Sequence, residues 1–149
     1  PSPPSPLPPT LEDVRDDLEG LVADNPGTPL ADKAEDAAKQ IDEALVELAK
    51  PTPDVAAALG KLEGAAGDLE AMVRDELVAE AEGEALLEAV AAAARTLASH
   101  AIAGAAGGDP NKLAEANAAL ADGDVLRDGG RYKDAVAKYR DAYSKAADA

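Results

Sequence analysis

Residues 28–50 read TPLADKAEDAAKQIDEALVELAK, and this stretch decides the fold class. Thr28 and Pro29 mark a helix start, because threonine caps helix N-termini and proline suits the first helical position. Apolar residues then recur at spacings of four and three: Leu30, Ala34, Ala37, Ile41, Leu45 and Leu48. This period predicts an amphipathic helix with one face buried against other helices.

The segments on both sides carry the same pattern. Thr10 and Asp13 have the spacing of a weak capping box, and the turn at residues 25–27 is expected to end the helix that follows. After Lys50-Pro51, the residues Thr52, Pro53 and Asp54 repeat the start signal, and a third apolar stripe is expected over residues 55–77. The short connection predicts that the second and third helices are antiparallel.

Glycine and proline divide the remaining chain into three further helices. Glu82-Gly83 is the expected break before a fourth helix, which is expected to end at Gly104 and the pair at residues 107–108. Asp109-Pro110 is expected to start a fifth helix, and Gly129-Gly130 to separate it from a sixth. No segment alternates with a period of two, so no sheet is expected.

The predicted fold is therefore an all-α, antiparallel bundle of about six helices. We expect residues 11–149 to form one helical domain, with a four-helix bundle over residues 11–103 and a helical hairpin over 109–148 that covers one side. Gly60, Gly64 and Gly67 lie inside the third helix, where each glycine costs about 1 kcal/mol relative to alanine. They predict close approach by a neighbouring helix, with a loosely packed helix as the alternative.

The first ten residues, PSPPSPLPPT, hold six prolines and favour an extended polyproline II spacer. A ligand for an SH3-type domain is the alternative. A spacer implies a further domain beyond it, so we expect residues 1–10 to link this domain to a longer protein. The chain begins with proline rather than methionine, which fits a fragment or a processed product.

The composition excludes several functional classes. The net charge of −16 disfavours binding to nucleic acid and to anionic membranes, which both attract lysine and arginine. Cysteine is absent, which excludes disulfides, thiolate nucleophiles and zinc–cysteine sites. The most apolar stretch, residues 85–106, contains Glu88, Arg95 and His100, so we expect a buried or amphipathic helix rather than a membrane span.

The last two helices resemble one tetratricopeptide-type hairpin. The matching positions are Gly123, Gly130, Tyr132, Ala135, Tyr139 and Ala142. Leu126 stands where an aromatic residue is usual and Ala119 where tryptophan is usual. A peptide-binding groove needs about three stacked repeats, and only one unit is present, so a structural hairpin is expected rather than a peptide receptor.

Most of the chain after residue 10 also resembles a helical module found at the C-terminal ends of large secreted or surface bacterial proteins. Its similarity lies in residues 27–33 (GTPLADK), 63–71 (EGAAGDLEA), 94–98 (ARTLA) and 121–139. The resemblance implies a location outside the cell and an accessory role. It implies no catalytic residues.

No set of residues predicts a cofactor or a metal site. Asp122, Asp124 and Asp128 suggest a calcium loop, but the EF-hand pattern of alternate ligands, glycine at position six and glutamate at twelve is not met. His100 is the only histidine, and a metal site wants several converging ligands. Glu84 and Glu88 have helical spacing, but such pairs arise by chance among 30 acidic residues.

The final hairpin carries the candidate interaction surface: Tyr132, Tyr139, Tyr143, Arg127, Arg131 and Arg140. Its basic residues are expected to pack against or pair with the acidic first helices, in the same molecule or in a second copy. The leading hypothesis is a non-catalytic domain of an exported bacterial protein that acts in attachment or assembly and binds a protein or an extracellular polymer. The alternative is an intracellular adaptor that binds a peptide through the hairpin, and an enzyme ranks last.

Overall fold

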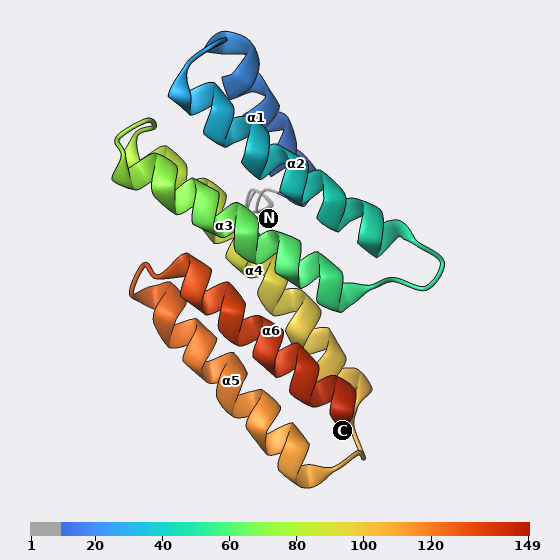
Figure 1. Cartoon of the computed structure of the whole chain (residues 1–149). Helices are drawn as coiled ribbons and strands as arrows, with labels where there is room; N and C mark the ends of the chain where they lie inside the picture. The colour runs from blue at the N-terminus through green and yellow to red at the C-terminus, as the bar shows by residue number, and fades with distance from the viewer. Residues whose placement is uncertain (1–9) are drawn as a thin grey trace, which may run out of the picture.

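Six helices make up residues 10–149, the part of the chain that the computed structural model describes (Figure 1). They are α1 (Leu11–Asp24), α2 (Pro29–Ala49), α3 (Val55–Arg74), α4 (Glu80–Gly104), α5 (Pro110–Asp128) and α6 (Tyr132–Asp148). The described residues contain no strand, and the predicted all-α bundle is confirmed. The predicted proline-rich linker, residues 1–10, lies outside the described residues except for Thr10.

The helix starts follow from side chains that cap the free backbone N–H groups. Thr10 and Asp13 form the predicted capping box, and the Thr28 hydroxyl accepts a hydrogen bond from the Ala31 N–H at 3.2 Å. The start of α3 differs from the prediction, because Asp54 and not Thr52 is the cap. Its carboxylate accepts from the Ala57 N–H at 3.0 Å, where the helix dipole also favours a negative charge.

The boundary between α3 and α4 also lies at a different position from the predicted one. The break falls at residues 75–79, and Gly83, the expected breaker, is a buried residue inside α4. Helix α3 ends because Glu76 adopts a left-handed backbone with φ 57°, which lets the Leu77 N–H bond to the Met72 carbonyl at 2.9 Å. Gly83 serves packing instead, since a Cβ there would collide with the Val73 side chain.

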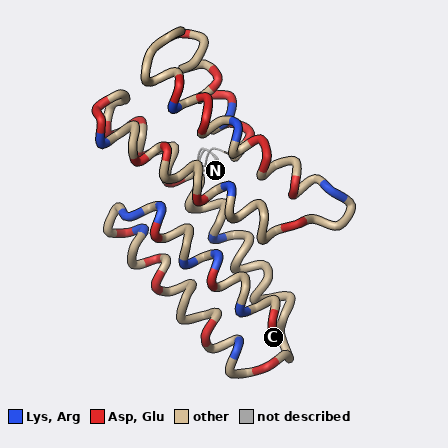
Figure 2. Tube along the Cα trace, in the orientation of Figure 1, with Lys and Arg blue, Asp and Glu red and all other residues tan. Residues whose placement is uncertain are grey.

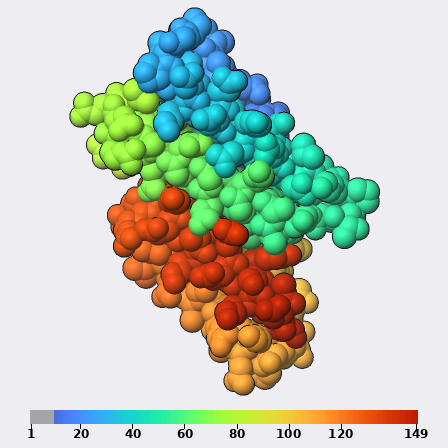
Figure 3. All heavy atoms as spheres, in the orientation of Figure 1, coloured from blue at the N-terminus to red at the C-terminus, as the bar shows by residue number. Residues whose placement is uncertain are grey.

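The helices form three successive hairpins, and α2, α3 and α6 lie side by side on one face (Figures 1 and 3). Helix α1 packs mainly against α2, and α5 packs mainly against α6. Helix α6 also packs against both α3 and α4. Helix α6 therefore belongs to the central layer of the fold. The whole hairpin is expected to cover one side of the bundle, but only α5 lies on the outside.

The core that joins these hairpins consists largely of alanine. More than half of the buried apolar residues are alanines, and the larger ones are mostly leucine and valine. Helix α4 is the one described helix that is long and apolar enough to cross a membrane. Eight of its 25 residues are buried in the protein core, including Leu86, Leu87 and Val90.

The interface between α2 and α3 contains a polar contact beside a glycine. The Gln40 amide donates to the Asp68 carboxylate at 2.7 Å, and a Cβ at Gly64 would collide with the same amide. Partial burial raises the pKa of Asp68, and the negative charge of Asp36 adds to this effect. The predicted close contact with a neighbouring helix is therefore found at Gly64, which lies against the side chain of Gln40 in α2. A Cβ at Gly60 or Gly67 would meet only the ends of Arg140 and Lys133, at ordinary van der Waals distances.

Replacing Glu76 by glycine should stabilise the protein by about 0.5–1 kcal/mol. A side chain in the left-handed conformation costs about 1–2 kcal/mol, and the greater freedom of glycine in the unfolded chain offsets part of the gain. Urea unfolding followed by circular dichroism measures the change. Glu76→Gln is the control, because it removes the charge and keeps the Cβ; an equal gain in that variant would assign the effect to charge and not to the backbone.

Replacing Asp68 by asparagine should raise the melting temperature at pH 7. A carboxyl group whose pKa is raised on folding destabilises the fold above that pKa, and protonation removes the penalty as the pH falls. The advantage of Asp68→Asn should therefore shrink as the pH falls toward 3.8, the ordinary pKa of aspartate. Thermal melts from pH 7 to pH 4 measure this, with Asp17→Asn in α1 as the control for loss of one exposed charge. A constant difference at all pH values would contradict the expectation.

Candidate functional site

The structure divides the six predicted surface residues into buried and accessible groups. Tyr139 is fully buried and Tyr132 is 7% exposed, whereas Tyr143 is half-buried. Arg127 is also half-buried, and Arg131 and Arg140 are exposed. The six therefore do not form one continuous surface.

Tyr139 joins α6 to α5 and, through a carboxylate, to α4. Its ring lies against Gly123, where an added Cβ would stand 2.5 Å from the ring edge. Its hydroxyl donates to Asp124 at 2.7 Å, and Arg95 of α4 donates to both oxygens of the same carboxylate at 2.8 and 3.1 Å. Burial and the bond to Asp124 raise the pKa of Tyr139 to about 12, while the bond from Arg95 lowers the pKa of Asp124.

A second ion pair ties α5 to α4 beside the first. The Arg127 guanidinium donates to the Glu88 carboxylate at 2.8 Å. Burial, followed by the negative charge of Glu88, raises the pKa of the nearby Tyr132 to about 12. We call this group of side chains the polar clasp; it consists of Glu88, Arg95, Asp124, Arg127 and Tyr139. The polar clasp contains two carboxylates and two guanidinium groups, so its charges balance. Its members bond to one another, so the polar clasp acts as a structural joint.

Several other basic residues of the hairpin also have partners within the molecule. Arg140 donates to Glu63 of α3 at 2.7 Å, and Lys145 lies 3.5 Å from Glu115 of α5. Arg131 pairs with Asp134 within α6. In Figure 2 several Lys and Arg positions lie along α6, and Asp and Glu positions lie along the neighbouring helices. Basic residues of the hairpin therefore pair inside one molecule with α3 and α4, and no ion pair in the described residues joins the hairpin to the first helices, α1 and α2.

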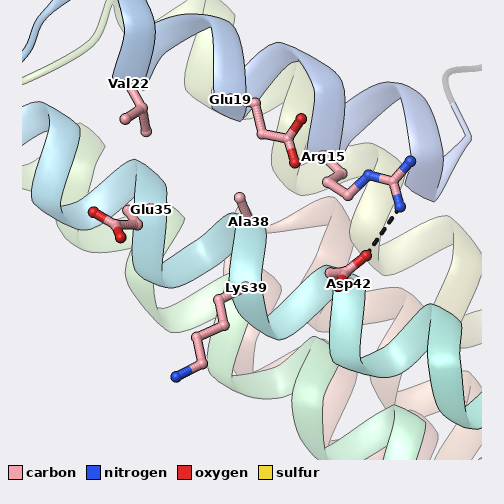
Figure 4. A pocket seen from close by; sticks show the side chains of 7 residues that line it. All are labelled: Arg15, Glu19, Val22, Glu35, Ala38, Lys39 and Asp42. Atoms are coloured by element: carbon pink, nitrogen blue, oxygen red, sulfur yellow. Dashed lines mark hydrogen bonds and ion pairs between the residues drawn. The ribbon is translucent and has the colours of Figure 1, made fainter.

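Two of the open grooves on the surface between helices are each larger than 500 Å³. The first, of about 530 Å³, lies between α1 and α2 and is crossed by an ion pair between Arg15 and Asp42 at 3.0 Å (Figure 4). That hydrogen bond is the main cause that raises the pKa of Arg15. The remaining charges of this groove, Glu19, Glu35 and Lys39, are exposed. The groove is a solvated crevice in which charges of both signs are mixed.

The second groove, of about 640 Å³, lies between the first half of α3 and the second half of α6. Its lining contains two of the predicted surface residues, Tyr143 and Arg140. The other lining residues are Ala56, Leu59, Glu63, Ala137, Asp141, Ser144, Ala147 and Asp148. This α3–α6 groove is the candidate functional site, because it combines apolar, aromatic and charged groups that solvent can reach.

The groups that suggested metal or acid–base chemistry are spread apart or occupied. Within residues 10–149, no three histidine, aspartate or glutamate side chains are placed to hold a metal ion. Asp124, part of the apparent calcium loop, is bonded to Arg95 and Tyr139. Glu88 pairs with Arg127, and His100 is exposed near the end of α4.

Sequence reasoning missed the polar clasp and the α3 side of the groove. Arg95 and Asp124 are 29 residues apart and lie on different helices, and Glu63 and Arg140 are 77 apart. Spacing along one helix gives no information on such pairs. No family model, curated protein or solved structure matches this chain.

Replacing Gly123 by alanine should destabilise the protein by up to about 2 kcal/mol. Overpacking against the buried ring of Tyr139 costs about 1–3 kcal/mol, and the better helix propensity of alanine returns about 1 kcal/mol. Gly20→Ala is the matched control, because an added Cβ in α1 meets no atom within 4 Å and should stabilise by about 0.5–1 kcal/mol. Chemical denaturation of both variants measures the difference, and a gain in both would show that α5 and α6 are not held together at Gly123.

Proposed function

We propose that this chain is a non-catalytic accessory domain of an exported bacterial protein that acts in attachment or assembly. The observation that supports this most is the α3–α6 groove, which is open to solvent and holds Tyr143 and Arg140. The polar clasp, in contrast, binds its own members, so its charged groups are engaged in holding α5 to the body. What the surface offers is a place for contact between macromolecules.

The proposed location outside the cell rests on the similarity of residues 27–33, 63–71, 94–98 and 121–139 to C-terminal modules of secreted or surface proteins. The proposed partner is a protein or an extracellular polymer. The net charge of −16 disfavours a nucleic acid partner and an anionic membrane, since both would be repelled. No cofactor is part of the proposal.

The alternative is an intracellular adaptor that binds a peptide around the three tyrosines of the hairpin. That function needs Tyr132, Tyr139 and Tyr143 partly exposed on one concave surface. Two of the three rings are buried, and only Tyr143 lines an open groove. The burial of Tyr132 and Tyr139 therefore argues against an adaptor that would bind a peptide with all three tyrosine rings.

The proposed function is tested by attachment and assembly assays on the whole chain. We expect the chain to sediment with purified bacterial peptidoglycan or with intact bacterial cells, or to form oligomers by size-exclusion chromatography with light scattering. A variant that unfolds the hairpin, Tyr139→Asp, serves as the control for nonspecific sedimentation. A monomer at all concentrations that stays in the supernatant with both materials would contradict the proposal.

A further inference from the structure

The α3–α6 groove opens where the two helices that form it diverge. Helices α3 and α6 run antiparallel and separate toward the start of α3 and the end of α6 (Figure 1). The groove is lined there by small residues, among them Ala56, Ala137 and Ala147, which leave space that larger side chains would fill. Leu59 also belongs to this lining but is fully buried, and Tyr143 provides a half-buried aromatic side chain.

The charges of this groove are not balanced. Arg140 is paired with Glu63 at 2.7 Å, which neutralises both groups. Asp141 and Asp148 are exposed, and within residues 10–149 neither forms an ion pair. Two carboxylates without an ion pair therefore line the same groove as Tyr143, and these groups can attract a cation that pairs with a carboxylate or lies over an aromatic face.

We propose that the α3–α6 groove binds a lysine- or arginine-bearing amphipathic helix of a partner protein, an inference that rests on the proposed function in assembly. The apolar face of such a helix would lie over Leu59 and the alanines, as a third helix beside α3 and α6. Its cationic side chains would pair with Asp141 and Asp148. This assigns the partner of the domain a positive charge and a helical form.

A second copy of this chain is a poorer occupant of the groove. Each copy carries a net charge of −16, so two copies repel one another. Two of the basic residues of α6 are also engaged with carboxylates of the same molecule, Arg140 with Glu63 and Lys145 with Glu115. A basic partner meets neither obstacle.

Fluorescence anisotropy with the full chain tests the proposal. The probe is a labelled synthetic helix of about 18 residues with leucine and alanine on one face and lysine on its flanks. The comparison probe replaces every lysine by glutamate. We expect the basic peptide to bind, the acidic peptide not to bind, and the affinity to fall as salt is raised from about 0.05 M to about 0.5 M.

Matched variants locate the binding site. Replacing both rim carboxylates, Asp141→Asn with Asp148→Asn, should weaken binding of the basic peptide about tenfold, since two charge pairs are lost. The control pair, Asp17→Asn with Asp32→Asn, removes the same charge from exposed positions of α1 and α2 and should change the affinity less than about twofold. Ala56→Arg adds bulk and positive charge at an exposed lining position and should abolish binding without unfolding the domain.

Several results would overturn the proposal. Equal losses in the rim and control pairs would show general attraction to an acidic protein and no site in the groove. An oligomer that Ala56→Arg converts to a monomer would make a second copy the occupant. Failure of the basic peptide to bind, while the chain still sediments with peptidoglycan or cells, would reject the basic helix and leave the proposed attachment function standing.

Discussion

The packing of small side chains is the constraint on which the rest of this structure depends. The chain has no phenylalanine or tryptophan, and more than half of its buried apolar residues are alanines. An alanine buries little area, so each contact between helices contributes little and many of them are needed. Small residues also let helices approach closely, and positions such as Gly64, Gly83 and Gly123 accept neighbouring side chains where a Cβ would collide. Stability thus depends on closely spaced helices and not on a few large residues.

An alanine surface fixes the spacing of helices more strongly than their register, because small side chains interlock little. Hydrogen bonds and ion pairs between helices are directional, so they fix the register that alanine packing leaves open. Helix α5 buries only Ala116 and Gly123, and its link to α4 includes Arg95 with Asp124 and Arg127 with Glu88. Tyr139 completes this joint, since its ring occupies the space left by Gly123 and its hydroxyl reaches Asp124. Tyr139, which the sequence analysis places on the candidate interaction surface, therefore positions the last two helices.

The sequence predicts the local features of this protein well, because they depend on neighbouring residues. The caps at Thr10, Thr28 and Asp109, the glycine turn after α5 and the six-helix count all follow from short patterns. The end of α3 differs from the prediction because the residue with the left-handed backbone, Glu76, is a glutamate and not a glycine. The central place of α6 and the burial of Tyr132 and Tyr139 could not be read from spacing, since alanine ridges on several helices are nearly equivalent. The α3–α6 groove depends on that packing and was out of reach for the same reason.

The same composition that weakens the core also shapes the surface. Where α3 and α6 diverge, alanines at the interface leave a groove that leucine or phenylalanine would have filled. The net charge of −16 adds electrostatic repulsion between copies of the chain, which opposes association through an apolar groove. Carboxylates at its rim, Asp141 and Asp148, are the groups on which the proposed choice of a basic partner rests. An acidic, alanine-rich bundle thus combines an accessible groove between its helices with a strong surface charge that opposes nonspecific association.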